Sequence, residues 1–297
     1  MKSPPTIAGL RTVHAAAITP RGKSGDLNFG ALFELIDYLS AARMGGIALF
    51  TRWGEYPALS VEERARVTYL AVKRSRVPVL AGVGSATFDH SLELAREARS
   101  AGVSAILLPP PHFYLCDEDD VCEFFTQFAV QLGSAPPIVI TGSLTPETAC
   151  RLLESGRFGG IVEDGGDSAV DHLRAAAIDS AVLAGDDRAL VPARRAGLGV
   201  LSAAACAAPE LTMALDAAIA TGNGEAIARL EGQRQELLHW LDRFPSPVGV
   251  KTAVAARGIQ TGPLPVPLSA AKQQCLSQFR EWFQAWLPAS RKLASHA

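Results

Sequence analysis

Residues Gly160-Ile161-Val162-Glu163-Asp164-Gly165-Gly166-Asp167 are the stretch from which the fold is best recognised. The first three residues form a short apolar run of the kind that makes a buried strand. The glycines and carboxylates that follow are typical of a turn. The same unit, a short apolar run followed by a turn and a longer amphipathic segment, recurs along the chain.

Eight such runs are expected to form strands, and the segments between them to form helices. The expected strands are Val13–Ile18, Gly46–Phe50, Val77–Ala81, Ala105–Leu108, Ile138–Ile140, Gly160–Val162, Ala181–Ala184 and Gly199–Leu201. The expected helices are Phe29–Arg43, one capped by Ser60 with Glu63 completing a capping box, His90–Ser100, Val121–Leu132, Pro146–Glu154, Ala169–Ile178, Asp187–Arg195 and Pro209–Thr221. Eight regular units in roughly 220 residues predict an α/β fold closed into a (β/α)8 TIM barrel rather than an open sheet.

After Gly222 the pattern changes to helices alone. Three more are expected, Glu225–Arg243, Gly249–Arg257 and Ser269–Leu287. We therefore expect a barrel over residues 1–222 and a C-terminal helical extension over residues 223–297.

Composition excludes several classes of protein. A net charge of -2 gives no basic field for nucleic acid or an anionic membrane surface. No apolar run approaches 18 residues, and the first ten residues lack an apolar core of signal-peptide length. The five cysteines form no C-x-x-C pair, so we expect reduced thiols in a cytoplasmic protein and no zinc site.

Several motifs at the expected strand ends resemble the dihydrodipicolinate synthase / N-acetylneuraminate lyase family, a class of pyruvate-handling (β/α)8 enzymes. The resemblance extends from about Thr12 to Trp286. Its framework matches are Gly54-Glu55, Leu59-Ser60, Glu63-Arg64, Gly82-Val83-Gly84, Gly185, Ser202, Pro209-Glu210, Val250-Lys251 and Gly258. The resemblance implies a lyase fold whose chemistry lies on the loops after the strands, with no cofactor or metal, in a homodimer or homotetramer.

The positions that carry the family's chemistry differ from its pattern. Val162 stands where the family has the lysine that forms a Schiff base with pyruvate, and Thr141 stands where it has the proton-relay tyrosine. Phe113, with His112 before it, occupies the position of the tyrosine that reaches a neighbouring subunit, and Tyr114 comes one residue later. The loop after Thr141 is also short, and the family's carboxylate-binding arginine has no counterpart there.

Arg52 and Trp53 replace two threonines that bind the substrate carboxylate in the family. Two alternatives are open for this pair. Arg52 binds a small anion such as a keto acid, a carboxylate or phosphate, or it pairs with an internal carboxylate, Glu55 or Glu163, in a plugged pocket. Glu55 itself is expected to satisfy backbone amides.

Other candidates have an ordinary structural alternative. His112 is either a general base or a surface residue, and Cys206 is either a nucleophile or a small buried thiol. Gly185 is expected at the edge of the site, with Asp186 or Asp187 capping the next helix. Lys251 is expected to be structural, since it matches a structural lysine of the family.

Three functions are compatible with these residues. The first is a non-catalytic or regulatory paralogue, a pseudoenzyme that keeps the scaffold and a ligand pocket. The second is an enzyme of changed chemistry on a small keto or sugar acid, using Arg52, His112, Thr141 or Glu163. The third is an active lyase with a relocated lysine, which ranks last because no spare lysine lies at the end of an expected strand.

Overall fold

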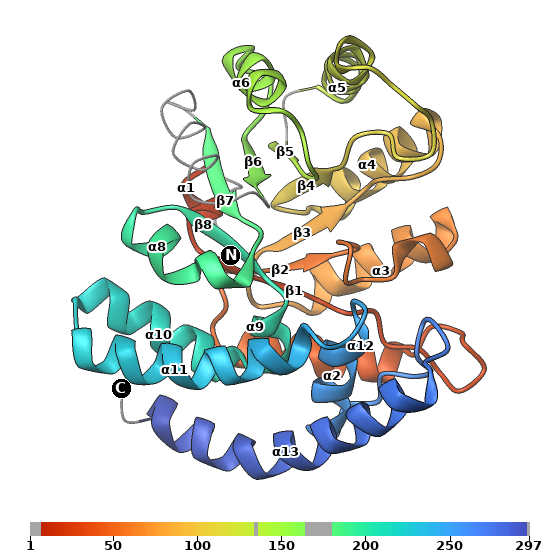
Figure 1. Ribbon diagram of the computed structural model, residues 1–297. Coiled ribbons are helices and arrows are strands. Elements are labelled where there is room, and N and C mark those ends of the chain that lie inside the picture. Colours follow the sequence, from red (N-terminus) through yellow and green to blue (C-terminus); the bar gives the residue numbers. More distant parts are fainter. Residues whose placement is uncertain (1–6, 134–135, 164–179, 296–297) are drawn as a thin grey trace.

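Eight parallel strands form a closed barrel in the order β1 to β8, with β8 paired to β1 (Figure 1). The structure is a computed structural model that describes residues 7–133, 136–163 and 180–295. The strands are β1 (Val13–Ala16), β2 (Gly46–Leu49), β3 (Val79–Gly82), β4 (Ala105–Leu108), β5 (Ile138–Ile140), β6 (Gly160–Glu163), β7 (Ala181–Ala184) and β8 (Gly199–Ser202). The TIM barrel predicted from the sequence is confirmed.

Alternate residues of each strand fill the centre of the barrel. In β1, Ala16 belongs to the inner cluster, whereas Val13 and Ala15 pack outward against the helices. The inner cluster contains Leu10, Ala16, Ala48, Leu80, Ala105, Leu107, Val139, Val162, Ala181, Leu183 and Leu201. Small residues on some strands face large ones on others, so the interior is a packed core.

Helices surround the barrel and account for most of the remaining chain (Figure 1). Their bounds are α1 (Ile7–Leu10), α2 (Phe29–Ala41), α3 (Val61–Arg74), α4 (Phe88–Ala101), α5 (Glu118–Leu132), α6 (Pro146–Glu154), α8 (Leu190–Arg195), α9 (Ala204–Ala207), α10 (Pro209–Thr221), α11 (Gly224–Leu241), α12 (Val248–Ala256) and α13 (Ala270–Ser295), with 3-10 turns η1 (Tyr56–Ala58) and η2 (Asp187–Ala189). The capping box of Ser60 and Glu63 is present at the start of α3. The expected helix Ala169–Ile178 and the turn Asp164–Asp167 lie outside the described residues.

Two short helices were not expected. α1 places Leu10 in the inner cluster of the barrel, and α9 follows β8 with four small buried residues. Each spans four residues, which is too short for a helical periodicity to be recognised in sequence.

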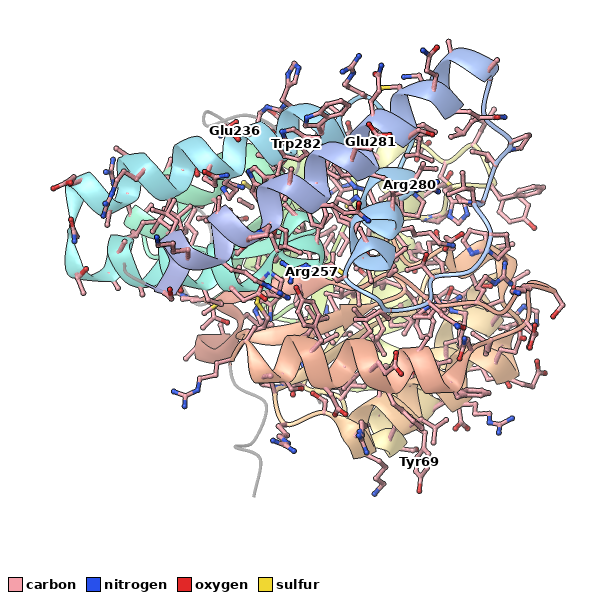
Figure 2. All side chains as sticks on the ribbon, turned by 90° about the horizontal axis from the view of Figure 1, so that it is seen from below. Tyr69, Glu236, Arg257, Arg280, Glu281 and Trp282 are labelled. Atoms are coloured by element: carbon pink, nitrogen blue, oxygen red, sulfur yellow. The ribbon has the colours of Figure 1, made fainter. Side chains whose placement is uncertain are left out.

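The C-terminal helices α11, α12 and α13 pack on one side of the barrel. The ring of Trp240 on α11 packs against the rings of Phe279 and Trp282 on α13, with centroids 5.7 Å and 5.6 Å apart. Arg257, seen from below in Figure 2, follows α12, pairs with Glu210 of α10 at 2.9 Å and lies over the ring of Tyr38. A domain boundary between residues 222 and 223 stays a prediction. No helix of the described chain is both long enough and apolar enough to span a membrane.

Candidate functional site

The carboxyl ends of the strands open onto a cavity of about 140 Å³, which we call the inner cavity. It is lined by Phe50, Thr51, Arg52, Trp53, Tyr56, Gly82, Leu107, Pro109, Thr141, Gly142, Val162 and Leu201. The four residues that the sequence placed at successive strand ends, Arg52, Trp53, Thr141 and Val162, therefore lie around one space. This is the end of a TIM barrel at which active sites form.

Val162 contributes to the floor of the inner cavity. Its side chain belongs to the inner cluster of the barrel together with Leu107 and Leu201, and it is 3% exposed. Strand pairing sets it opposite Leu183 of β7. The floor of the cavity is thus aliphatic at this position.

Hydroxyl groups stand around this aliphatic floor. Thr51, Tyr56 and Thr141 all line the cavity. Burial raises the pKa of Tyr56, and the neighbouring Arg64 opposes that rise. The phenol therefore stays protonated at neutral pH and is able to donate a hydrogen bond. Tyr56 was not singled out from the sequence, although a phenol directly after the Gly54-Glu55 motif was a usable signal.

The segment that carries Arg52 and Trp53 is held in a strained conformation. Phe50 before it and Glu55 after it have positive φ angles of 55° and 52°. Such residues cost on the order of 1–3 kcal/mol each and persist where their surroundings fix them. Thr19 donates a hydrogen bond to the carbonyl of Gly54 at 2.6 Å, which is one of the contacts that hold this segment.

A buried ion pair fixes the end of the same segment. The Lys251 ammonium of α12 donates to Glu55 Oε2 at 2.8 Å and to the carbonyl of Pro263 at 2.8 Å. The Lys251 side chain is fully buried, and that of Glu55 is 6% exposed. Lys251 has the structural role expected of it. The expectation that the Glu55 carboxylate accepts hydrogen bonds from backbone amides was wrong. Its partner is the side chain of Lys251, which is 196 residues away in the sequence.

A second buried cation supports the opposite wall of the inner cavity. Arg64 is 3% exposed and donates to the carbonyls of Gly82 at 2.8 Å and Gly84 at 2.7 Å. Gly82 is required there because a Cβ would lie 2.2 Å from the carbonyl oxygen of Phe50. The Gly82–Gly84 turn is thus a rigid part of the wall.

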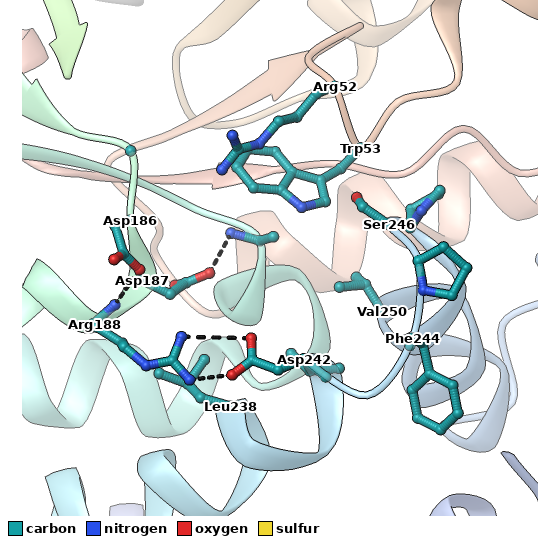
Figure 3. A pocket seen from close by; sticks show the side chains of 16 residues that line it. Arg52, Trp53, Asp186, Asp187, Arg188, Leu238, Asp242, Phe244, Ser246 and Val250 are labelled. Atoms are coloured by element: carbon teal, nitrogen blue, oxygen red, sulfur yellow. Dashed lines mark hydrogen bonds and ion pairs between the residues drawn. The ribbon is translucent and has the colours of Figure 1, made fainter. Parts of the chain in front are cut away.

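A second space of about 280 Å³, the outer cavity, lies beside the ends of β7 and β8. It is lined by Arg52, Trp53, Gly185, Asp186, Asp187, Arg188, Ala203, Leu238, Leu241, Asp242, Phe244, Pro245, Ser246, Pro247, Gly249 and Val250. Figure 3 shows Arg188 paired with Asp242 on one side of it and Trp53 on the other. Its wall therefore carries charges of both signs.

Asp187 at the edge of the outer cavity has structural partners. It accepts hydrogen bonds from the Ser202 hydroxyl and from the backbone amides of Ala203 and Ala204. Burial raises its pKa, while Arg234 at 3.8 Å acts in the opposite direction. It is Asp186 that caps η2, by accepting from the amide of Arg188. Of the two aspartates considered from the sequence, the cap is therefore Asp186.

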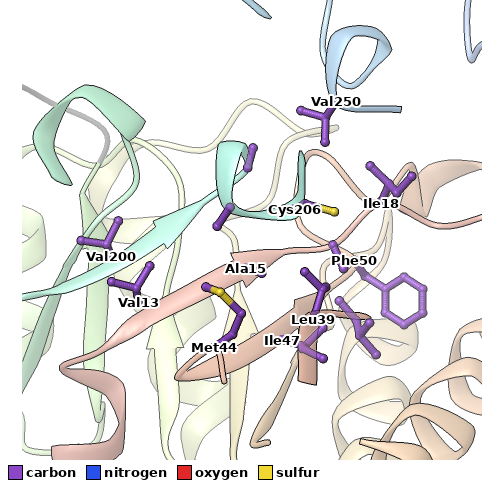
Figure 4. Close-up of a cluster of buried hydrophobic side chains, with 14 of the residues drawn as sticks. Val13, Ala15, Ile18, Leu39, Met44, Ile47, Phe50, Val200, Cys206 and Val250 are labelled. Carbon is purple, nitrogen blue, oxygen red and sulfur yellow. The ribbon is translucent and has the colours of Figure 1, made fainter. Parts of the chain in front are cut away.

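Four of the candidate residues, Glu163, His112, Phe113 and Cys206, line neither cavity. His112 is exposed and lies edge-on to Tyr56 with ring centroids 6.4 Å apart, and Phe113 is 74% exposed. Cys206 lies in the hydrophobic core near Ile18 and Val250, as Figure 4 shows. Burial raises the pKa of the Cys206 thiol to about 11, so it is an inert thiol at neutral pH. Within the described ranges, no three His, Cys, Asp or Glu side chains gather in a way that would hold a metal ion.

Comparison with known proteins supports the interpretation of the fold and motifs. The model of the dihydrodipicolinate synthetase family matches residues 9–285. The 4-hydroxy-tetrahydrodipicolinate synthase of Methanothrix thermoacetophila is 32% identical over 283 residues, which are 92% of this chain and 95% of that protein. That of Bacillus subtilis is 31% identical, over 86% of this chain and 92% of that protein.

Solved structures give the same result. The 4-hydroxy-tetrahydrodipicolinate synthase of Methylacidiphilum fumariolicum SolV superimposes with a TM-score of 0.85 at 26% identity, covering 95% of this chain and 98% of that chain. A crystal structure of a dihydrodipicolinate synthase is 27% identical with a TM-score of 0.82, over 91% of this chain and 98% of that chain. With a family model that matches nearly the whole chain and relatives above 30% identity, this chain belongs to the dihydrodipicolinate synthetase family.

Proposed function

We propose that this chain is a member of the family that binds a small carboxylic acid at the barrel mouth without forming an imine, and that it is not an active pyruvate aldolase. The observation that carries the proposal is the aliphatic side chain of Val162 in the floor of the inner cavity. An imine needs a primary amine at that position, and valine has none. Thr141 in the same wall has an aliphatic hydroxyl, which is a much weaker acid than a phenol.

The position of Lys251 argues against a relocated Schiff-base lysine on α12. Its ammonium is fully buried and bound by the Glu55 carboxylate and the Pro263 carbonyl. These two hydrogen bonds occupy the Nζ atom, and Lys251 lines neither the inner nor the outer cavity, so a ligand bound there does not meet its amine. Lys251 is therefore unsuited to act as a nucleophile.

Borohydride trapping tests the absence of an imine. The protein is incubated with pyruvate and sodium borohydride, and its intact mass is measured beside the Bacillus subtilis relative treated in the same way. We expect no added mass on this chain. A stable adduct with the mass of a reduced pyruvate imine on any lysine would refute the proposal. Val162→Lys is expected to stay without aldolase turnover, because Thr141 still replaces the tyrosine.

An enzyme of changed chemistry on a small keto or sugar acid is the second candidate. It is favoured by the protonated phenol of Tyr56, which could donate a proton or hydrogen bond to a ligand in the inner cavity. Turnover of a panel of keto and sugar acids that is lost in Tyr56→Phe would support this candidate. No turnover of any acid by the wild type favours the non-catalytic protein.

We further propose that the protein is a homodimer or homotetramer in the cytoplasm. The assembly is supported by three consecutive apolar side chains on the loop before α5, Phe113, Tyr114 and Leu115, which are 74%, 59% and 106% exposed. Contiguous exposed apolar groups commonly mark a contact surface. The cytoplasmic location is supported by the five cysteines, none of which is in a disulfide.

A further inference from the structure

The two cavities at the barrel mouth have two lining residues in common. Of the described residues, only Arg52 and Trp53 line both the inner and the outer cavity. These are the two bulky residues at the tip of the strained segment that follows β2. They therefore form the partition between the two spaces.

Trp53 makes up the body of this partition. Its ring packs against the inner cluster of the barrel and also against the main hydrophobic core outside it. The Arg52 guanidinium carbon lies 4.2 Å from the centroid of the indole, and Figure 3 shows the two side chains running along one another. A cation over an indole face is attracted by the ring, so this stack helps to hold the two side chains in place.

The segment that carries Trp53 is held on both sides of the ring: Phe50 before it is buried in the main hydrophobic core, and the two residues after it bond to distant parts of the chain. Gly54 is bound through its carbonyl to Thr19, and Glu55 is bound to the buried Lys251. The amide of Trp53 also donates to the Thr51 hydroxyl at 3.4 Å. Because the backbone is held on both sides of the ring, displacing Trp53 requires these contacts to break, and the partition acts as a wall of fixed position.

The size of the inner cavity limits what fits behind this wall. Its volume is about 140 Å³. An engineered apolar cavity of about 150 Å³ holds one benzene molecule, which has six heavy atoms. A ligand confined to the inner cavity thus has about six heavy atoms, which corresponds to a short acid such as isobutyrate or pyruvate.

We infer that Trp53 determines the length of the ligand that this protein accepts, by closing the inner cavity off from the outer one. The inference rests on the proposed binding of a small carboxylic acid at the barrel mouth. The aliphatic end of the ligand packs on Leu107, Val162 and Leu201, and its carboxylate faces the hydroxyls of the rim. Removing the indole joins the two cavities and admits a longer acid whose polar end reaches the Arg188–Asp242 pair.

The test compares two acids of different length. Dissociation constants for isobutyrate and for 6-hydroxyhexanoate are measured by calorimetry on the wild type, Trp53→Ala and Trp53→Phe, with Trp282→Ala as a matched control on α13. We expect the wild type and the control to prefer isobutyrate. Trp53→Ala should shift the ratio of the two constants towards the longer acid by about tenfold or more, as expected for a pocket that gains several methylenes of room. Trp53→Phe should shift it less.

Equal ratios in the wild type and Trp53→Ala would overturn the inference, and so would the absence of binding of both acids to every variant. Circular dichroism and melting curves establish that the variants are folded, and Trp53→Leu replaces Trp53→Ala if the latter fails to fold. The borohydride test is independent of this one. A pyruvate adduct would refute the proposed function, whereas the ratio of the two dissociation constants tests only the role of Trp53.

Discussion

Acidification should destabilise this protein through one histidine in the barrel, His14. The side chain is fully buried, and its Nε2 atom lies 3.2 Å from the carbonyl oxygen of Leu10. A carbonyl oxygen only accepts, so Nε2 must carry the proton in the neutral ring. Nδ1 has no hydrogen-bond partner, and it is the atom that would take up the second proton. A proton there would be buried without an acceptor.

The size of the effect follows from the pKa. Burial lowers the pKa of His14 from 6.5 to about 4, with the Leu10 carbonyl opposing and the Arg194 charge adding to the fall. At about 1.4 kcal/mol per pKa unit, this change corresponds to about 3 kcal/mol of stability. Because the folded pKa is the lower one, the unfolded chain binds the proton first. The contribution of neutral His14 to the free energy of unfolding is therefore fully present above about pH 7.5. It decreases as the pH falls from about 6.5 to about 4, and about 2 kcal/mol of it is lost at pH 5.

Urea unfolding of the wild type and His14→Gln at about pH 7.5 and about pH 5 measures this loss. Glutamine keeps an amide donor for the Leu10 carbonyl but takes up no proton. Other titrating groups act on both proteins, so the difference between the two free energies of unfolding isolates His14. That difference should change by about 2 kcal/mol between the two pH values, in favour of the variant at the lower one. A difference that stays constant with pH would refute the reasoning.

Three further perturbations test other features. Lys251→Met leaves the Glu55 carboxylate buried without its partner and should lower the free energy of unfolding by about 3–5 kcal/mol. The double variant Lys251→Met/Glu55→Gln should recover part of that loss. Equal losses of stability in the single and the double variant would contradict the ion-pair account. With a thiol reagent on the native protein, exposed Cys116 should react at once and buried Cys206 only as fast as the protein unfolds, so rapid labelling of Cys206 in a peptide mass map would contradict its placement. Leu115→Ser should shift the sedimentation profile towards smaller species, and a wild type that is already monomeric would refute the proposed assembly.

The barrel could be predicted from the sequence because its strands carry a strong local signal. Strands buried on both faces are continuous apolar runs, and Ala105–Leu108, Ile138–Ile140 and Ala181–Ala184 were located to the residue. The capping box of Ser60 was equally local. The larger deviations were at helix ends: α13 runs to Ser295 where Leu287 was the expected end, and α5 begins at Glu118 where Val121 was the expected start.

The contacts that shape the candidate site had no such signal. The pairing of Glu55 with Lys251 joins residues 196 positions apart, and no local pattern specifies it. Trp53 and Tyr56 line the same cavity, and that placement depends on the backbone conformation of the segment after β2, which no local sequence pattern specifies. The sequence placed Arg52, Trp53, Thr141 and Val162 at strand ends, but it held no sign that Trp53 lines two cavities.

The Glu55–Lys251 bond also bears on the order in which the molecule can be completed during synthesis. All eight strands end by Ser202, whereas the lysine that holds the mouth segment is on α12, and the carbonyl it also binds comes later, at Pro263. Chains emerge from the ribosome N-terminus first. A nascent chain that has already exposed all of its strands therefore still lacks the cation that pairs with Glu55, and the barrel mouth takes its final form only after α12 and the chain up to Pro263 have been made.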